Sequence, residues 1–417
     1  MFLYKFLLTI FYPIIRIVLT IRRNKGKEDA HPDRFAERLG RPSLARPNGF
    51  LIWLHGASVG EINSMRGLIE HLHKNYPKAE ILLTSGTTTS AKIAKNFDVI
   101  HQYSPIDVPF VIRRFIRHWQ PDMAIRVDSD LWPIQLDAIQ KAKIPNFLIN
   151  GAISKKSFRR YQKNKFFTRK ILNSFTKIMA KSKLDAQHFR NLGAKNVSII
   201  DNLKYTVPFL PDKPTERKKI MTAINTRPIW HAAVLGEGES KIIFDAHREI
   251  LKKLPKAFLI ITPRHPKMKE ELAQSGKDLK ITFRSDNTIP SGNVYVADTI
   301  GEMGLFYRCA KIAFMGRSLL PECRGSSPIE AMQLDNIIIT GKHTSTFNEV
   351  YDEMSKNNIL ERIDNEKQLS KLVLNFLNNK KIFDLRATAT KKFIANKKNT
   401  INVIMKELKP YLKQIKS

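Results

Sequence analysis

The chain has 417 residues, with few cysteines and few acidic side chains. Its two cysteines, Cys309 and Cys323, are too few for a disulfide framework or a four-thiolate zinc site, so we expect a reducing compartment. It contains no tandem repeat of solenoid period. Its 42% hydrophobic and 26% charged residues exclude a disordered chain and a polytopic membrane protein. At about 150 residues per domain, the length predicts two or three folded domains.

Acidic residues are outnumbered by basic ones. There are 38 Asp and Glu against 71 Lys and Arg, which gives a net charge of +33. Two explanations stay open, a lysine-rich proteome or a polyanionic partner such as an anionic membrane. The chain lacks zinc-finger spacing, an RNA-recognition signature and a basic helix leading into a heptad zipper, so a nucleic-acid-binding protein is the weaker alternative.

The longest apolar stretch is at the N-terminus, where residues 2–21 read FLYKFLLTIFYPIIRIVLTI. It is barely long enough to span a bilayer, and Lys5 and Arg16 favour a position at the interface. We therefore predict a membrane anchor helix over residues 1–27, with the body of the protein on the cytoplasmic side. A cleaved signal peptide is disfavoured because RRNKGKED, and no small-residue cleavage site, follows. A buried helical hairpin is the other alternative.

Short apolar runs alternate with amphipathic segments through the rest of the chain, which predicts an α/β fold with parallel sheets. We expect an N-terminal domain over residues 28–206 and a C-terminal domain over 207–417, with the Pro-rich stretch 207–219 as linker. The Lys- and Asn-rich end, from about Lys367, is predicted to form surface helices. Buried strands are expected at 50–56, 81–85, 123–128, 146–151, 197–201, 228–234, 258–264, 293–298, 311–316 and 336–341.

Loops at the ends of the first-half strands carry the candidate acceptor-side residues. The first strand leads into HGASVGE, which places Ser58, Gly60 and Glu61 in a tight turn before a helix. Glu61 could act as a base on a bound hydroxyl, or it could merely complement the helix dipole. Asp128 and Asp130 follow the third strand. They could bind a sugar hydroxyl, and no further ligand cluster supports a metal.

In the second half, three loops could bind an anion. Arg264 follows a strand in TPRHP, where its guanidinium suits a phosphate, although a proline-bounded surface turn explains it equally. DTIGEM, at 298–303, offers backbone amides at a helix start. RGSSPIE, at 324–330, does the same and adds Glu330 as an acceptor for ribose hydroxyls. Together these loops predict an anionic nucleotide donor in the second domain and an acceptor in the first.

In this order, the motifs resemble the 3-deoxy-D-manno-octulosonic acid (Kdo) transferase family. Its members are membrane-associated GT-B glycosyltransferases, with two Rossmann-like domains facing a cleft, that transfer Kdo from CMP-Kdo to a lipid A precursor. The resemblance covers nearly the whole chain. It rests on RFAERLGRP, WLHGASVGE, YSPIDVP, DSDLWP, NGAIS, DNLKY, PRHP, DTIGEM, the glycine-rich PIE loop and the closing FNE.

The resemblance implies a role for each candidate residue. Glu61 would be the general base, and Asp128 and Lys204 would stabilise the transition state. Ser58, Gly60 and Asp130 would lie in the acceptor site. No metal and no cofactor is implied, since CMP-Kdo is a substrate, and the protein is expected at the cytoplasmic face of the inner membrane. CMP would be held by Pro263, Arg264, Gly301, Glu302, Met303, Ser327, Pro328, Ile329 and Glu330.

The chain departs from the family pattern at four segments. Asp128-Ser129-Asp130 replaces Glu-Thr-Glu, and residues 150–154 lack the arginine of Asn-Ala-Arg-x-Ser. Residues 234–236 read Val-Leu-Gly where the family has Ser-Thr-His, and 326–327 are serines where it has His and Asn. The alternative to a transferase is therefore a catalytically altered, membrane-bound member that binds lipid.

Overall fold

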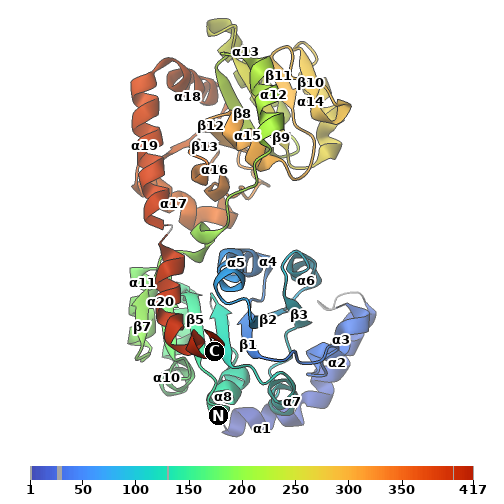
Figure 1. Cartoon of the computed structure of the whole chain (residues 1–417), viewed down its shortest axis with the longest axis vertical. Coiled ribbons are helices and arrows are strands. Elements are labelled where there is room, and N and C mark those ends of the chain that lie inside the picture. Colours follow the sequence, from blue (N-terminus) through green and yellow to red (C-terminus); the bar gives the residue numbers. More distant parts are fainter. Residues whose placement is uncertain (1, 26–30, 129–130, 398, 417) are drawn as a thin grey trace. The chain divides into compact units, whose positions relative to one another are not determined.

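The computed structural model describes residues 2–25, 31–128, 131–397 and 399–416. These divide into two compact units (Figure 1). Unit 1 comprises residues 1–208 together with 397–417, and unit 2 comprises residues 209–396. Each unit is built on a parallel sheet covered by helices, which confirms the predicted α/β class with two Rossmann-like halves.

The sheet of unit 1 has seven strands within the described part of the chain, in the order β3-β2-β1-β4-β5-β6-β7. Every pair of neighbours is parallel. Its central strands are almost completely buried because helices cover both faces, which explains their continuous apolar runs. The strands are β1 (Phe50–His55), β2 (Ala79–Ser85), β3 (Ile100–Tyr103), β4 (Met123–Val127), β5 (Asn146–Gly151), β6 (Lys177–Ala180) and β7 (Val197–Ile199).

Helices of unit 1 connect these strands, and one more returns from the C-terminus (Figure 1). The α-helices are α1 (Phe2–Ile10), α2 (Tyr12–Asn24), α3 (Phe35–Arg38), α4 (Val59–Ser64), α5 (Arg66–Asn75), α6 (Thr88–Ala94), α7 (Pro109–Trp119), α8 (Pro133–Lys141), α9 (Lys155–Gln162), α10 (Lys165–Leu172), α11 (Lys183–Asn191) and α20 (Thr400–Leu412). Short 3-10 helices are η1 (Pro32–Arg34), η2 (Leu203–Thr206) and η6 (Lys413–Lys416).

The sheet of unit 2 repeats this plan with the order β10-β11-β9-β8-β12-β13-β14, again with parallel neighbours throughout the described residues. Its first strand, β8, lies in the interior of the sheet, as β1 does in unit 1. The strands are β8 (Ile229–Leu235), β9 (Phe258–Pro263), β10 (Ile281–Phe283), β11 (Val294–Val296), β12 (Ile312–Met315), β13 (Ile337–Thr340) and β14 (Leu360–Arg362).

The connections of unit 2 are mostly helical. Its α-helices are α12 (Pro214–Ile224), α13 (Ser240–Lys253), α14 (Lys269–Ser275), α15 (Met303–Cys309), α16 (Ile329–Gln333), α17 (Asn348–Lys356), α18 (Glu366–Asn378) and α19 (Lys380–Lys397). The 3-10 helices are η3 (Pro266–Met268), η4 (Arg284–Asp286) and η5 (Ser345–Phe347).

All ten predicted strands are present, each within two residues of its expected bounds. Four further strands, β3, β6, β10 and β14, were not predicted. Each has only three or four residues, which is too short for a periodic apolar pattern to be recognised in the sequence. The predicted linker is shorter than expected, because α12 begins at Pro214 and the unit boundary falls after Pro208.

The C-terminal limit of the second domain was wrong. We expected the domain to extend to residue 417 and its last helices to lie on the surface, but residues 397–417 belong to unit 1. In α20, the side chains of Ile404, Leu408 and Leu412 are buried in the same apolar cluster as residues of β1 and α5. The helix closes one face of the unit 1 sheet, and this burial outweighs the polar composition of the segment.

The N-terminal segment forms two helices instead of the single predicted one. Proline occupies the first turn of α2, at Pro13, where its missing N–H is tolerated but would interrupt a continuous helix. Within the described residues, no single helix is long and apolar enough to cross a bilayer; the pair α1–α2, bent by 53°, reaches that limit only when taken together. Most large apolar side chains of this pair are exposed, which contradicts a buried hairpin.

Replacing Leu408 by Ala tests where the C-terminal helix packs. The side chain is fully buried, so its truncation should destabilise unit 1 by about 2–5 kcal/mol and leave unit 2 unchanged. Hydrogen–deuterium exchange of peptides from each sheet measures the two effects separately. Leu385→Ala, at an exposed position of α19, is the control and should change neither unit. Faster exchange in unit 2 alone would contradict the assignment.

Candidate functional site

The first candidate residues lie at the carboxyl edge of the unit 1 sheet, where its strand order reverses. β1 connects on one side to β2 and pairs on the other with β4, so the loops after β1 and β4 are neighbours. Open parallel sheets bind ligands at such a switch point. The loop after β1 carries Glu61, and the loop after β4 carries Asp128. Asp130 lies outside the described residues.

Glu61 lies in the first turn of α4, which Ser58 caps. The Ser58 hydroxyl accepts from the Glu61 backbone N–H at 3.3 Å and donates to its carboxylate at 3.1 Å. The other carboxylate oxygen accepts from the backbone N–H of Ala57 at 2.6 Å. The carboxylate is thus held over its own loop, half-buried and in reach of solvent. The negative charge complements the dipole of α4 at its N-terminus, which was one of the two expectations for Glu61. Its position at the edge of the sheet also suits a general base.

A chain of hydrogen bonds links Asp128 to the segment that carries Lys204. The side-chain amide of Asn150, at the end of β5, donates to the Asp128 carboxylate at 2.5 Å and its oxygen accepts from the Leu203 N–H at 2.9 Å. Asp128 and Asn150 both have left-handed backbones, with φ of 64° and 59°. The sharp turns at both strand ends therefore aim these two polar side chains at each other.

The η2 helix holds Lys204 beside the Glu61 loop. It contacts α4, α5 and α20, and Gly67 of α5 permits the approach, because a Cβ there would lie 2.0 Å from the Thr206 carbonyl oxygen. Asn202 caps η2 by accepting from the Lys204 N–H at 3.0 Å. Glu61, Asp128 and Lys204, which are far apart in sequence, thus come from three loops at one edge of the sheet.

Unit 2 has an equivalent switch point between β8 and β12, and a buried glutamate joins its two loops. The Glu239 carboxylate accepts from the Gly236 N–H at 2.8 Å after β8. It also accepts from the N–H groups of residues 317, 318 and 319 after β12, at 2.6, 2.7 and 2.9 Å. The sequence analysis did not identify Glu239. Its only local signal was an acid just before a helix, and the three N–H groups after β12 that it binds are 78 to 80 residues away.

The predicted donor-site residues of unit 2 lie at the carboxyl ends of neighbouring strands. Pro263 and Arg264 follow β9, and the Arg264 N–H donates to the Leu235 carbonyl at 2.8 Å while its side chain is exposed. The loop after β11 reaches α15 through Gly301, whose φ of 88° favours glycine, and open space lies over its Cα. Met303 then begins α15.

Glu302 is engaged within its own unit. Its carboxylate accepts from Arg284 at 2.5 and 2.8 Å, from Lys213 at 2.9 Å, and from the Thr299 hydroxyl. Arg284 holds the pKa of Glu302 down, to about 2. The side chain is therefore committed to an internal ion pair, and only the backbone at this position is open to a ligand.

The loop that ends in Glu330 surrounds a partly desolvated carboxyl. Burial raises the pKa of Glu330, and the Ser327 hydroxyl donates to it at 2.5 Å, which offsets part of the rise. Ser326, next to it, donates to the Gly316 carbonyl at 3.0 Å and accepts from the Tyr351 hydroxyl at 2.9 Å through its own carbonyl. Pro328 and Ile329 start α16. The serines that replace His and Asn are thus built into the loop.

The altered segment at the end of β8 is strained. Val234 has a φ of 55°, a backbone conformation that β-branched residues rarely adopt. Its N–H donates to the Thr262 hydroxyl at 3.3 Å, which helps to hold this conformation.

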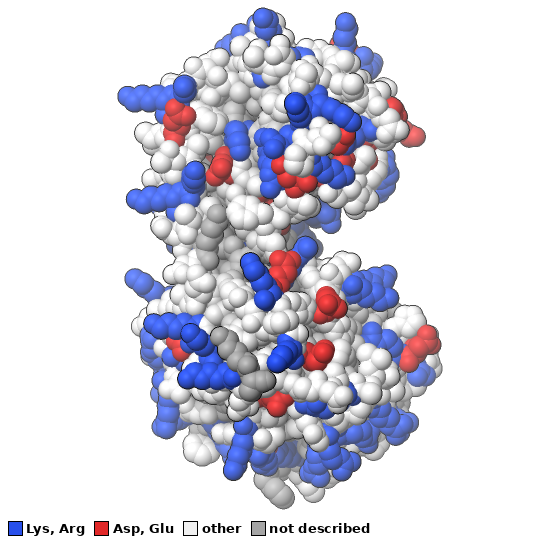
Figure 2. All heavy atoms as spheres, viewed as in Figure 1, with Lys and Arg blue, Asp and Glu red and all other residues white. Residues whose placement is uncertain are grey.

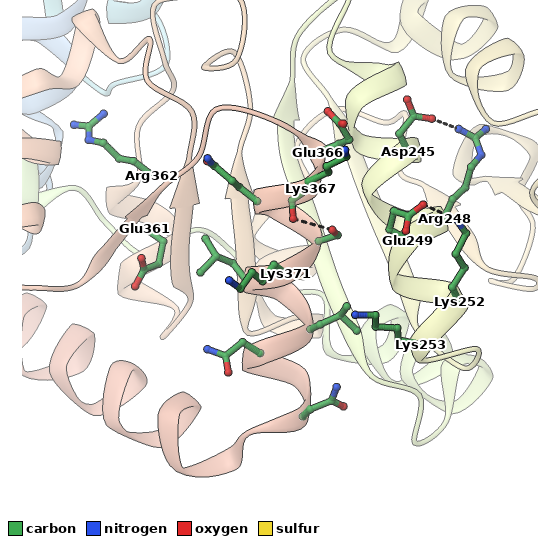
Figure 3. Close-up of a pocket in the computed structure, with 16 residues that line it drawn as sticks. Asp245, Arg248, Glu249, Lys252, Lys253, Glu361, Arg362, Glu366, Lys367 and Lys371 are labelled. Carbon is green, nitrogen blue, oxygen red and sulfur yellow. Dashed lines mark hydrogen bonds and ion pairs between the residues drawn. The ribbon is translucent and has the colours of Figure 1, made fainter.

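Among the residues that the structure describes, unit 2 carries pockets of different size and lining. One of about 620 Å³ borders the DTIGEM loop and is lined by residues that include Lys213, Arg284 and Ile300. The other, of about 1360 Å³, lies between α13 and α18 and contains none of the predicted site residues (Figure 3). Several of its charges pair with one another, such as Arg248 with Asp245 at 2.6 Å. Among the described residues, no group of three or more His, Cys, Asp or Glu side chains could hold a metal ion.

Replacing Glu239 by Gln tests the bridge between the two loops of unit 2. Both carboxylate oxygens of Glu239 accept hydrogen bonds, but a glutamine side chain has only one acceptor oxygen, and its NH2 group is a donor. Buried N–H groups at 236 or 317–319 therefore lose their acceptor. We expect unit 2 to lose roughly 2 kcal/mol or more, with faster hydrogen exchange at residues 316–319. Glu249→Gln, at an exposed position of α13 beside Lys252, is the matched control. Equal stability of the two variants would show that the bridge is unimportant.

The low pKa of Glu302 predicts a pH effect on stability. Because folding lowers this pKa from 4.5 to about 2, the ion pair stabilises the protein above pH 4.5 and loses this effect as the pH falls toward 2. Glu302→Gln should therefore be less stable than the parent at neutral pH, and the gap should shrink in acid. Urea unfolding of unit 2, followed by the fluorescence of Trp230, measures this; a constant gap would contradict it.

Comparison with known proteins identifies the family. The sequence pattern described as "3-Deoxy-D-manno-octulosonic-acid transferase (kdotransferase)" matches residues 33–207. A 3-deoxy-D-manno-octulosonic acid transferase of Haemophilus influenzae is 31% identical over 99% of both chains, and one of Rickettsia bellii is 32% identical over 82% of both.

Solved structures agree on the fold alone. A UDP-GlcNAc 2-epimerase from Neisseria meningitidis superposes with a TM-score of 0.57, covering 86% of this chain and 99% of its own at 11% identity. A glycosyltransferase from Rickettsia africae gives a TM-score of 0.51 at 15% identity, covering 88% of this chain and 99% of its own. With two parallel seven-stranded sheets, the protein has the GT-B fold. Its identity to the curated relatives shows that the chain belongs to the Kdo transferase family of glycosyltransferases.

Proposed function

We propose that the protein transfers Kdo from CMP-Kdo to a lipid A precursor, lipid IVA, in lipopolysaccharide biosynthesis. Membership of the Kdo transferase family supports the reaction class. The observation that supports this assignment is that the segments of Glu61, Asp128 and Lys204 lie at one edge of the unit 1 sheet, by its switch point. Such an edge is where parallel α/β domains bind their ligands.

In the proposed reaction, Glu61 takes the proton from the acceptor hydroxyl as its oxygen attacks the anomeric carbon of Kdo. The bond from that carbon to the CMP phosphate breaks, CMP leaves with both bonding electrons, and the configuration inverts. Glu61 suits this task because its carboxylate is oriented by Ala57 and Ser58 and remains half-exposed. Ser58, Gly60 and Asp130 would line the acceptor side.

Charge develops as CMP leaves, and two groups are proposed to stabilise it. The anomeric carbon also bears a carboxylate, so the transition state combines oxocarbenium character with two anionic groups. The Lys204 ammonium would offset the negative charge, and Asp128 would stabilise the positive carbon. The hydrogen bonds through Asn150 hold both segments in place, so little reorganisation is needed during the reaction.

Unit 2 is proposed to bind CMP. The exposed guanidinium of Arg264 suits the phosphate, and the open backbone at 301–303 offers N–H groups to it. Glu330, with Ser327, would accept from the ribose hydroxyls. Because the leaving group carries its own phosphate, and cationic and amide groups can receive its charge, we propose that transfer needs no metal ion.

The N-terminal helices are proposed to hold the protein at the cytoplasmic face of the inner membrane. Large apolar side chains of α1 and α2 are exposed, among them Leu3, Phe6 and Ile14, and Arg22 and Arg23 follow in the last turn of α2. An apolar face next to cations is typical of a helix that lies in the interface. The lipid-linked acceptor would be met at the same surface.

The altered loops support one alternative, a family member that binds lipid without transferring Kdo. Val234 keeps a strained backbone, and Gly236 lacks the side chain that the family has near the donor. Calorimetric titration with CMP separates the two proposals. Binding that is lost in Arg264→Gln supports a transferase; no CMP binding together with tight binding to lipid favours the alternative.

Glu61→Gln is the direct test of the mechanism. Without a base, kcat should fall by roughly 10²–10⁴-fold, with little change in CMP affinity. The assay is incubation with CMP-Kdo and a tetra-acylated lipid A precursor, followed by mass spectrometry of the product. Glu70→Gln, an exposed acid on the next helix that pairs with Arg66, is the control and should keep full activity. Undiminished product formation in Glu61→Gln would remove Glu61 as the base.

A further inference from the structure

A long segment of unit 1 contains no acidic residue. Between Asp137 and Asp185 the chain has no Asp or Glu, although it has 13 Lys and Arg. A uniformly lysine-rich composition would add cations but would not remove every acid from this stretch. The charge surplus is therefore concentrated here, at Lys141, Lys143, Lys155, Lys156, Arg159, Arg160, Lys163, Lys165, Arg169, Lys170, Lys177, Lys181 and Lys183.

Eight of these cations lie on the helical hairpin α9–α10, which spans residues 155–172. All eight are exposed, and among the residues that the structure describes none of them forms an ion pair. The face of unit 1 in Figure 2 carries many more Lys and Arg than Asp and Glu side chains. Unpaired, exposed cations of one sign raise the local potential and attract an anionic surface.

The hairpin also presents an aromatic side chain and adjoins the apolar N-terminal helices. Phe166, in the first turn of α10, is 85% exposed. Its neighbour Phe167 contacts Tyr4 of α1, with ring centroids 5.9 Å apart. On α1, Leu3 and Phe6 are 67% and 53% exposed. The basic hairpin and the exposed apolar face of α1 are thus parts of one continuous surface.

We propose that the α9–α10 hairpin is a docking surface for the anionic headgroups of a lipid bilayer. The cations would bind headgroup phosphates, and Phe166 would enter the boundary with the acyl chains. Nucleic acid shares the charge but gives no reason for exposed aliphatic side chains beside the cations, so a bilayer fits better. The proposal extends the membrane contact beyond the N-terminal helices and does not depend on Kdo transfer.

The first helix of the hairpin begins close in sequence to a residue of the candidate site. α9 begins at Lys155, four residues after β5 ends at the carboxyl edge of the sheet, close in sequence to Asn150. α10 then reaches α1 through Phe167. The hairpin therefore begins near the carboxyl edge of the unit 1 sheet, and its second helix contacts α1.

The test replaces four exposed lysines of the hairpin, Lys155, Lys156, Lys163 and Lys165, by Gln in the full-length protein. Partitioning is measured by co-sedimentation with vesicles of phosphatidylcholine alone or mixed with phosphatidylglycerol. Each cation near an anionic surface adds to binding, so we expect roughly a tenfold or greater loss on the mixed vesicles and no change on the neutral ones. The loss should diminish as salt is raised.

A matched variant removes the same charge from unit 2 by changing Lys253, Lys256, Lys367 and Lys371 to Gln. These four lysines are also exposed. The unit 2 variant should bind to both kinds of vesicle as the parent does. Equal binding of the two variants to mixed vesicles would overturn the proposal, as would a loss confined to a duplex oligonucleotide. Kdo transfer to detergent-dispersed acceptor should be unchanged in the hairpin variant. Absence of product in every variant would count against the proposed function and leave the docking surface standing.

Discussion

The parallel pairing of β1 with β4 is the constraint on which the candidate site depends. Because strand order reverses there, the loop after β1 and the loop after β4 emerge side by side, with no intervening connection to cover them. The Asp128–Asn150–Leu203 hydrogen bonds then tie in the segment of Lys204. Three short polar segments that are far apart in sequence thereby lie at one edge of the sheet.

In unit 2, a buried carboxylate joins the two loops at the switch point. This carboxylate belongs to Glu239, which gathers four backbone N–H groups from the two loops that the strand order brings together. A buried carboxylate is tolerated there because every lone pair that it exposes to the interior has a donor. The Glu239 bridge anchors the backbone at Gly236, two residues after the strained Val234.

Charge is distributed unevenly over the molecule, and this sharpens the meaning of the +33 surplus. Many cations elsewhere form local ion pairs, as in the groove between α13 and α18 (Figure 3). The α9–α10 hairpin contains no acidic residue of its own, and its residue Phe167 contacts the exposed apolar helix α1. A general excess of lysine and a selected surface thus coexist, and the pattern of missing acids separates them.

Strand periodicity, loop chemistry and motif order determined from sequence alone the α/β class, ten of the strands and the family resemblance. These are local properties, since an apolar run such as FLIITP is buried wherever a parallel sheet forms. Tertiary structure alone decided two things: the packing of α20 on unit 1 and the bridge of Glu239. Both depend on partners far away in the chain, at β1 and at residues 317–319. Their energy comes from burial and long-range hydrogen bonds, which no local window of sequence contains.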